Sequence, residues 1–457
     1  MNIQNKSFYL SRKEIEAFKP AGQKPEFPND LAKPLRRGME KYGLFEPEQL
    51  AGRTFPIACI ALEITQRCNL DCTLCYLSDL AEAVKDVPLF ELERRIDMIH
   101  AHYGENTNIQ ITGGDPTLRS IPDLVKIAQM IKARNMRSAL FTNGIKANRE
   151  MLEAMSAAGL NDVVFHVDLT QERKGYETEE QLNKIRLDYI NRAKGLPLRI
   201  MFNTTVFEDN FHEIPMLVSF FSDHADKIDL SSFQLQADTG RGVLRKRDAQ
   251  LITQESVMQQ LRDGTGLALN YDYPLIGHSD CNKYTSIMVS GNKRTVLFDD
   301  REFFNKLFGV LASVGDNWAE PSIVIRRAIF KALRSPSLLW SGTKFWVKKF
   351  WALKSGIIRG NGVHRINFFI HNFMDAEKLE CERCETCVFM VATADGPLSM
   401  CVHNAKRDQM ISKPARDKNG KVLWNPLDPI INTERLPLKK LKGRLRDVAD
   451  KQRKTSA

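Results

Sequence analysis

The chain has 457 residues, 43% of them hydrophobic, with nine cysteines and a formal net charge of +10. This size and apolar content exclude a disordered chain and predict two or three domains or one large barrel with appendages. The odd number of cysteines, clustered at metal-ligand spacing, favours a reducing compartment over a disulfide framework. No apolar signal region opens the chain and no apolar run reaches about 18 residues, so we expect a cytoplasmic protein without a spanning helix.

Residues 1–55 are polar and carry scattered prolines, which predicts an N-terminal extension with one or two short helices. From residue 56 to 240, short β-rich runs alternate with longer amphipathic runs. Strands are expected at 57–64, 108–112, 137–141, 162–168, 198–205 and 227–234, with helices at 89–103, 120–134, 149–158, 179–194 and 213–224. This alternation predicts an α/β fold of six βα units around a parallel sheet.

Three cysteines, Cys68, Cys72 and Cys75, follow the first expected strand with three and then two residues between them. Three thiolates on a cubic [4Fe-4S] cluster leave one iron open for another ligand. The alternative is a structural zinc site, but such sites are closed by four ligands, and no second cysteine pair follows at the usual distance. Cys59 lies inside the first expected strand and is predicted to be a buried apolar residue.

Polar residues or glycines follow every later strand of this region. In β/α barrels, reactive groups collect at the carboxyl ends of the strands, so we expect these segments to line one site. They are Thr112-Gly113-Gly114-Asp115-Pro116, Thr142-Asn143-Gly144, His166-Val167-Asp168, Asn203-Thr204-Thr205 and Gln234-Leu235-Gln236. Alternatives stay open: the glycine-containing segments are also common turns, and His166 is more often a hydrogen-bonded rim histidine than a proton donor.

The run from Leu62 to Tyr76 resembles the cysteine signature of the radical S-adenosylmethionine (SAM) superfamily, although Leu74 precedes the last cysteine where most members carry an aromatic residue. The resemblance implies a partial (β/α)6 barrel over residues 56–240 with a [4Fe-4S] cluster on Cys68, Cys72 and Cys75. It also implies that SAM is chelated at the open iron and cleaved reductively to a 5′-deoxyadenosyl radical. A flavodoxin or ferredoxin is the expected electron donor.

The same resemblance implies which residues contact SAM. Gly113, Gly114, Asp115 and Pro116 stand where the family carries a Gly-Gly-Glu motif, and their backbone carbonyls would take the SAM ammonium. We therefore expect a Gly114→Val change to weaken SAM binding without loss of iron. The other implied contacts are Thr142, Asn143, Asp168, Asn203, Gln234 and Arg241, the last as a charge-assisted partner of the methionyl carboxylate. A capping role for Asp168 and a surface loop for Arg241 are the alternatives.

Residues 241–300 are expected to link the barrel to an auxiliary region that includes Cys281, with a helix at 254–262 and a hairpin turned at Gly291. Residues 301–370 hold four of the five tryptophans and a net charge of +9. Aromatic and basic residues on opposite faces of short helices suit a membrane surface. The equal alternative is a helical subdomain whose aromatics fill its own core, and nucleic acid is the less favoured partner.

Residues 371–457 form a cysteine-rich region followed by a basic tail, in which a helix is expected at 438–454. Cys381, Cys384, Cys387 and Cys401, together with Cys281, provide five thiols. Four thiols close a second [4Fe-4S] cluster and leave one to spare, with structural zinc as the competing interpretation.

The C-terminal half also shows a narrower resemblance to the tetraether lipid synthases and related pterin methyltransferases, through Gly277-His278-Ser279-Asp280-Cys281 and Asp395-Gly396 with Cys401-x-x-Asn404. The paired N-terminal cysteines of the lipid synthases are missing. Three hypotheses follow: a radical SAM enzyme acting on a lipid or alkyl chain by C–C coupling or methyl or methylene transfer, a radical SAM enzyme modifying a peptide, and a non-catalytic iron–sulfur or zinc module. The first would place the cytoplasmic protein on the inner membrane face.

Overall fold

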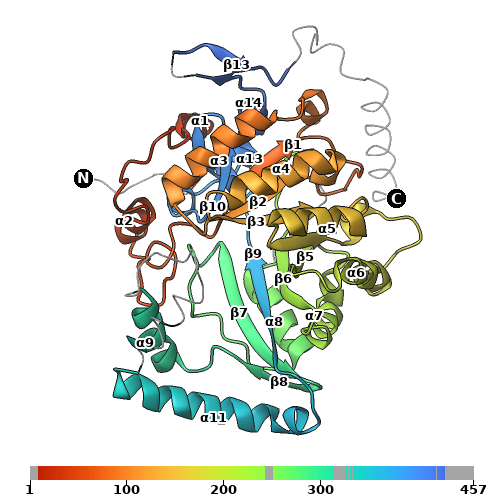
Figure 1. Ribbon diagram of the computed structural model, residues 1–457, viewed down its shortest axis with the longest axis vertical. Helices are drawn as coiled ribbons and strands as arrows, with labels where there is room; N and C mark the ends of the chain where they lie inside the picture. The colour runs from red at the N-terminus through yellow and green to blue at the C-terminus, as the bar shows by residue number, and fades with distance from the viewer. Residues whose placement is uncertain are drawn as a thin grey trace.

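Strand β1 (Cys59–Thr65) is buried along its whole length, as expected for a parallel strand whose two faces are both covered. The computed structural model describes residues 9–241, 251–312, 326, 330, 331, 333–417 and 419–427. Within these residues β1 belongs to an eleven-stranded sheet of order β11-β10-β1-β2-β3-β4-β5-β6-β9-β7-β8 (Figure 1).

The other strands are β2 (Asn108–Gly113), β3 (Arg137–Thr142), β4 (Asp162–His166), β5 (Arg199–Val206), β6 (Ile228–Leu235), β7 (Asn282–Ser290), β8 (Lys293–Val296), β9 (His364–His371), β10 (Phe389–Thr393), β11 (Gly396–Ser399) and a separate pair, β12 (Ala415–Arg416) and β13 (Val422–Trp424). The helices are α1 (Arg12–Ala17), α2 (Lys33–Lys41), α3 (Leu89–Tyr103), α4 (Ile121–Lys132), α5 (Arg149–Ala158), α6 (Glu179–Ala193), α7 (Ile214–Asp223), α8 (Gln254–Thr265), α9 (Arg301–Ala312), α11 (Pro336–Ile358), α12 (Cys381–Glu385), α13 (Met400–Ala405) and α14 (Arg407–Ile411). Short 3-10 helices are η1 (Asp79–Ala83), η2 (Pro116–Leu118), η3 (Leu169–Gln171) and η4 (Phe211–Glu213).

Strands β1 to β6 are parallel neighbours, and helices α3 to α7 connect them in turn. This arrangement confirms the α/β fold and the partial (β/α)6 barrel. The helix starts carry strong local signals, because the side chains of Ser120, Asn148 and Thr178 accept hydrogen bonds from backbone amides of the first turns of α4, α5 and α6. Such caps explain why the predicted helix boundaries lie close to those observed.

One predicted strand is too long. Strand β4 ends at His166 and not at residue 168, because the side chain of Asp168 accepts a hydrogen bond from the backbone amide of Thr170 and begins η3. Asp168 is therefore a cap, which is the alternative that its sequence context left open.

The C-terminal part of the chain extends the barrel sheet at both edges. Strand β10 pairs in parallel with β1, and β9 pairs in parallel with β6. The N-terminal extension packs against the same region, since the amide of Leu10 donates to the carbonyl of Leu379 at 2.7 Å and that of Ala21 to Pro397 at 2.9 Å. The regions separated at residues 55, 240, 300 and 370 therefore contribute strands to one sheet or pack against it. The division of the chain into domains at these residues stays a prediction.

Helix α11 has one buried face and one exposed face. Its residues Leu338 and Phe345 join Phe303, Phe304 and Phe308 in a buried cluster, while its outer face is exposed. Lys349 lies on the buried face, where its Nζ is 2.5 Å from Oδ1 of Asp299, so this lysine is not available to a membrane. Trp318, one of the four tryptophans of residues 301–370, and the helix expected at 438–454 lie outside the described residues.

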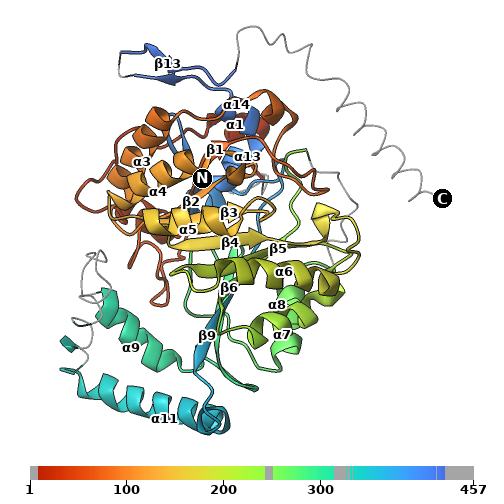
Figure 2. The same ribbon diagram turned by 45° about the vertical axis from the view of Figure 1, so that its right-hand side comes forward.

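Helix α11 sits far from the carboxyl ends of the barrel strands. Gly356 packs against the backbone of Ser290, at the turn between β7 and β8. That turn lies beside the beginning of β9, which runs parallel to β6, and thus at the amino-terminal edge of the sheet. Figures 1 and 2 show α11 at one end of the molecule, opposite α13 and α14. In the described part of the chain, every helix is too short or too polar to cross a bilayer.

Candidate active site

The loop between β1 and η1 carries Cys68, Cys72 and Cys75, all free and partly exposed. Burial is the main cause of a raised pKa at Cys68 and Cys72, and the charges of neighbouring cysteines of the same loop raise the pKa further. Because the charge of one cysteine changes the pKa of another, the three thiols must lie near one another. A bound cation would relieve this cost and favour the thiolate forms, so the residues fit a cluster held by three thiolates.

The glycines after β2 pack against the cysteine loop itself. A Cβ on Gly113 would lie 1.9 Å from the carbonyl oxygen of Thr65, and one on Gly114 would lie 2.0 Å from that of Arg67. The amide of Gly114 donates to Thr65 and that of Asp115 to Arg67, at 2.9 and 2.7 Å. Only a residue without a side chain allows this approach, so the two glycines hold the loop that carries the cysteines.

The buried carboxylate of Asp115 joins the ends of β2 and β3. It accepts hydrogen bonds from the Thr142 hydroxyl and the Asn143 amide, each at 2.9 Å. The side chain of Asn143 then donates to Oδ1 of Asn69 in the cysteine loop at 2.7 Å. The two motifs predicted to contact SAM therefore also form the frame that positions the cysteines.

A second polar network lies at the ends of β4 and β5. Nε2 of His166 lies 2.6 Å from Oδ2 of Asp168 and 3.2 Å from the Thr205 hydroxyl. Burial alone would lower the pKa of His166, but the charge of Asp168 raises it above its usual value. Asp168 is fully buried, and the amide of Thr205 also donates to it at 2.7 Å. His166 is thus a hydrogen-bonded rim histidine whose ring borders the cavity.

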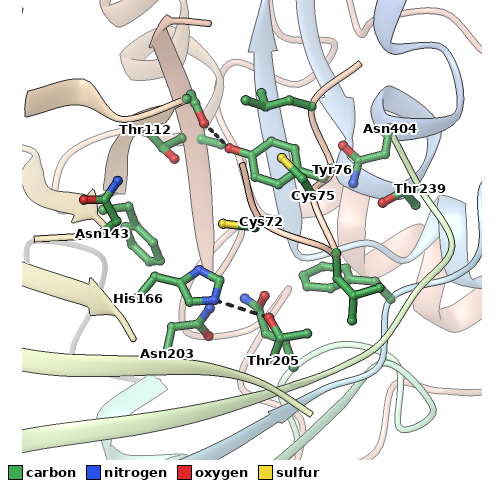
Figure 3. A pocket seen from close by; sticks show the side chains of 18 of the residues that line it. Cys72, Cys75, Tyr76, Thr112, Asn143, His166, Asn203, Thr205, Thr239 and Asn404 are labelled. Atoms are coloured by element: carbon green, nitrogen blue, oxygen red, sulfur yellow. Dashed lines mark hydrogen bonds between the residues drawn. The ribbon is translucent and has the colours of Figure 1, made fainter. Parts of the chain in front are cut away.

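These networks surround a cavity of about 240 Å³ at the carboxyl ends of the barrel strands. In Figure 3, Cys72 and Cys75 project into a space between Asn143 on one side and Thr239 and Asn404 on the other. The predicted residues that line the cavity are Gly113, Gly114, Asp115, Thr142, Asn143, Asn203 and Gln234, with Cys72 and Cys75. The structure brings these together as expected, whereas Cys68, Pro116, Asp168 and Arg241 are not among the lining residues.

Arg241 is not among the residues that line the cavity, but it lies near the cysteine loop: burial alone would lower its pKa, and the charges of Cys75 and Glu82 raise it above the usual value. Its guanidinium pairs with Glu82 at 2.7 Å, and its amide donates to the carbonyl of Leu77 at 2.6 Å. The preceding Gly240 lies so close to the backbone of Tyr76 that a Cβ would meet it at 2.3 Å. The segment after β6 therefore clamps the end of the cysteine loop.

A further polar cluster of the cavity wall, formed by Glu63, Tyr76 and Arg407, was not predicted from the sequence. The guanidinium of Arg407 donates to both carboxylate oxygens of Glu63, at 2.7 and 3.0 Å, and lies 4.5 Å from the centroid of the Tyr76 ring. The Tyr76 hydroxyl in turn donates to the carbonyl of Gly113. Glu63 and Arg407 are 344 residues apart, and no local signal marked either of them. The aromatic residue after Cys75 was the available clue for Tyr76.

The remaining cysteines form a second group beside the barrel. Burial raises the pKa of Cys384, and the charges of Cys401, Cys387 and Cys281 raise it further, each more than Cys381 does. Arg383 places its Nε 3.1 Å from Sγ of Cys281 and provides positive charge for a set of thiolates. These four thiols fit one closed cluster.

The contacts of the Cys381 thiol are with a phenol and a carboxylate. Its Sγ lies 3.7 Å from the Tyr42 hydroxyl and 3.4 Å from the carboxylate of Glu385. Across the described ranges, no three residues among His, Cys, Asp and Glu are arranged to hold a single metal ion. Cluster ligands bind different iron atoms and so stand farther apart than the ligands of one ion.

The fold and site define an α/β protein whose cysteine-lined cavity is suited to an iron–sulfur cluster and a small cofactor. Residues 62–221 match the family model of the radical SAM superfamily. The chain therefore carries a radical SAM domain over these residues.

Two relatives and one solved structure illustrate this similarity. The chain is 27% identical over 186 residues to a 7,8-dihydro-6-hydroxymethylpterin dimethyltransferase of Methanocaldococcus jannaschii, covering 39% of this chain and 36% of the relative. It is 26% identical over 241 residues to a PqqA peptide cyclase of Bradyrhizobium diazoefficiens, covering 50% and 61%. Less than two thirds of either relative is thus matched. Streptococcus suis SuiB bound to precursor peptide SuiA aligns with a TM-score of 0.37 and 16% identity over 50% of this chain and 49% of that one.

Replacing Gly114 by Ala should release iron as well as SAM. Because the new Cβ would lie 2.0 Å from the Arg67 carbonyl oxygen, the cysteine loop must move, and a displacement of about 1 Å costs on the order of 100-fold in rate. This revises the expectation that iron survives a side chain at this position. Iron content and SAM cleavage are the measurements, with Gly309→Ala as control, since a Cβ there meets nothing within 4 Å. Full iron with weak SAM binding would mean that Gly114 contacts SAM but does not hold the cysteine loop in place.

Proposed function

We propose that the chain binds a [4Fe-4S] cluster through Cys68, Cys72 and Cys75 and uses it to cleave SAM. The observation that carries this proposal is the position of three cysteines on one loop, two of which, Cys72 and Cys75, line a cavity at the carboxyl ends of six parallel strands. When bound, the cluster would supply the electron that splits the SAM sulfonium, and the resulting 5′-deoxyadenosyl radical would attack an unactivated C–H bond. The residues of the protein would bind and orient SAM and keep water away from the radical.

The cavity-lining residues of the predicted set are the proposed SAM contacts: Gly113, Gly114, Asp115, Thr142, Asn143, Asn203 and Gln234. Pro116, Asp168 and Arg241 are proposed to act through their neighbours. Asp168 orients His166, and Arg241 holds Leu77 and Glu82 at the end of the cysteine loop.

The test is a SAM cleavage assay on anaerobically reconstituted protein with a chemical reductant. Formation of 5′-deoxyadenosine and methionine is the expected result. Iron-replete protein that binds SAM and forms neither product would overturn the proposal and favour a non-catalytic iron–sulfur module.

We further propose a second [4Fe-4S] cluster on Cys281, Cys384, Cys387 and Cys401. The support is their mutual effect on pKa values, together with the position of Arg383 beside Cys281. The spare thiol is then Cys381. Structural zinc at the same four ligands is the alternative, and metal analysis separates the two.

A Cys401→Ala change should lower the iron content from about eight to about four atoms per chain, because a closed cluster needs all four thiolates. The matched Cys381→Ala change should leave about eight, because that thiol lies with Tyr42 and Glu385. Iron and acid-labile sulfide are measured after anaerobic reconstitution. Loss of iron in the Cys381 variant, with full iron in the Cys401 variant, would contradict the assignment.

For the substrate we propose a lipid or another alkyl chain, modified by C–C coupling or by methyl or methylene transfer. The support is the apolar part of the cavity wall, made by Leu70, Leu74, Leu77, Phe141, Leu235, Phe373, Val391 and Met400. The similarity to a pterin dimethyltransferase accords with transfer of a one-carbon group. A peptide substrate is the second candidate, because a named peptide cyclase matches over 241 residues.

We propose a cytoplasmic location, with a flavodoxin or ferredoxin as electron donor and no nucleic-acid partner. Titration with each reduced donor protein in place of the chemical reductant checks the donor. A position on the inner membrane face is the finer proposal, and its support lies in helix α11.

A further inference from the structure

The outer face of α11 is a row of exposed aromatic side chains. Trp340, Trp346 and Trp351 keep 65%, 54% and 59% of their surface exposed, and Val347 and Phe350 keep about half. In a helix, residues three, four and seven apart share a face, and these five positions fall on the side away from the core. The helix thus packs on the protein with one face and leaves a large apolar face without a protein partner among the described residues.

Positive charge borders this aromatic row. Helix α11 contains four lysines and no acidic residue, and Lys344, Lys348 and Lys354 are exposed. The ammonium of Lys344 lies 4.9 Å from the Trp340 ring, and that of Lys354 lies 4.0 Å from the Trp351 ring. Lys348 also contacts Asp299 at 2.9 Å while 65% of its side chain stays exposed. Rings and cations therefore occur side by side along the helix.

We propose that this face docks on the surface of an anionic lipid bilayer. Tryptophan rings prefer the boundary between headgroups and acyl chains, and lysine stems lie along apolar surface while their ammonium groups reach the headgroups. A helix with both features lies in the plane of the membrane with its apolar face inserted. A second copy of the chain is a poorer partner, because a symmetric contact would bring the lysines of one helix against those of the other.

The docking surface and the cavity face different ends of the sheet. Helix α11 packs at the β7–β8 turn, on the amino-terminal edge, and the cavity lies at the carboxyl ends. Docking would therefore hold the enzyme at the membrane with its cavity pointing away from the contact. This inference does not depend on the proposed catalytic function or on the class of substrate.

Co-sedimentation of the reconstituted holoenzyme with vesicles tests the proposal. The vesicles contain phosphatidylcholine and phosphatidylglycerol in equal parts, and vesicles of phosphatidylcholine alone serve as the uncharged comparison. Each basic residue near an anionic surface contributes about 1 kcal/mol, or on the order of fivefold in affinity. Changing Lys344, Lys348 and Lys354 together to Gln should weaken binding on the order of 100-fold. Added salt should act similarly, because the Debye length is only about 8 Å at physiological ionic strength.

The matched control changes three exposed lysines elsewhere, Lys126, Lys174 and Lys184, to Gln. It alters net charge equally and should keep vesicle affinity within about twofold. A Trp346→Ser/Trp351→Ser variant should also lose binding, and tryptophan emission of the wild type should shift to shorter wavelength on vesicles. All variants should retain iron and SAM cleavage, which separates this proposal from the catalytic one.

Three results would overturn the proposal: wild-type protein that fails to bind anionic vesicles at low salt, equal losses in both lysine variants, or a dimer in sedimentation equilibrium that Trp346→Ser/Trp351→Ser dissociates. The last result would assign the face to a second copy of the chain.

Discussion

Changing Cys68, Cys72 and Cys75 together to Ala should abolish SAM cleavage and remove about half of the iron, from about eight atoms per chain to about four. The cause is loss of all three thiolates of the cysteine loop, while the second group of thiols, Cys281, Cys384, Cys387 and Cys401, stays in place. Iron, acid-labile sulfide and 5′-deoxyadenosine are measured on the same anaerobic preparation.

The control is Cys59→Ala, a change of the same kind at a buried position inside β1, which should keep both iron and cleavage. If the triple variant still forms 5′-deoxyadenosine, the proposed catalytic centre is wrong. If the wild type holds about four irons and one zinc, the proposal of a second cluster is wrong and the proposed catalytic centre stands.

The second large effect is expected at the buried ion pair of Glu63 and Arg407, whose side chains are 6% and 3% exposed. A Glu63→Gln change leaves the guanidinium buried without a countercharge, and breaking such a pair costs about 3–5 kcal/mol. We expect an equivalent fall in the free energy of unfolding, measured by urea denaturation under anaerobic conditions. The double variant Glu63→Gln/Arg407→Met should recover much of the loss, because it removes the unpaired charge.

The pH dependence has a defined sign. Burial alone would raise the pKa of Glu63, but the charge of Arg407 lowers it from 4.5 to about 2. A carboxyl with a lowered pKa stabilises the folded state fully above its ordinary pKa and loses that contribution as the pH falls. The difference in stability between wild type and Glu63→Gln should therefore narrow from pH 4.5 toward pH 2. A difference that is constant over this range, or a double variant no more stable than the single one, would contradict this account.

Much of the barrel could be predicted because its signals are local. A parallel strand covered on both faces is a short apolar run, as in Cys59–Thr65. Helices α3 and α5 have the predicted bounds because their periodicity is strong, and the side chain of Asn148 also caps α5. The cysteine loop is a further local signal, since its ligands lie within eight residues of one another. Because the loop follows β1, the site was expected at the carboxyl ends of the strands, where the cavity lies.

The less predictable features depend on contacts between distant parts of the chain. Glycines after β2 were predicted to approach SAM, yet their closest contacts are the carbonyls of Thr65 and Arg67. Composition identified the aromatic and basic character of residues 301–370, but it did not assign Lys349 to the buried face and Trp346 to the exposed one. That assignment depends on how α11 packs against α9 and the β7–β8 turn.

The sequence by itself determined the α/β class, the six parallel strands and the group of three cysteines, because periodicity and short spacing act over a few residues. Only the tertiary structure decided that β10 lies beside β1, that Arg407 pairs with Glu63, and that the thiol of Cys381 lies next to Tyr42 and Glu385. These features join segments up to 344 residues apart. Their pairing follows from burial, charge and the packing of the whole sheet, which no local pattern records.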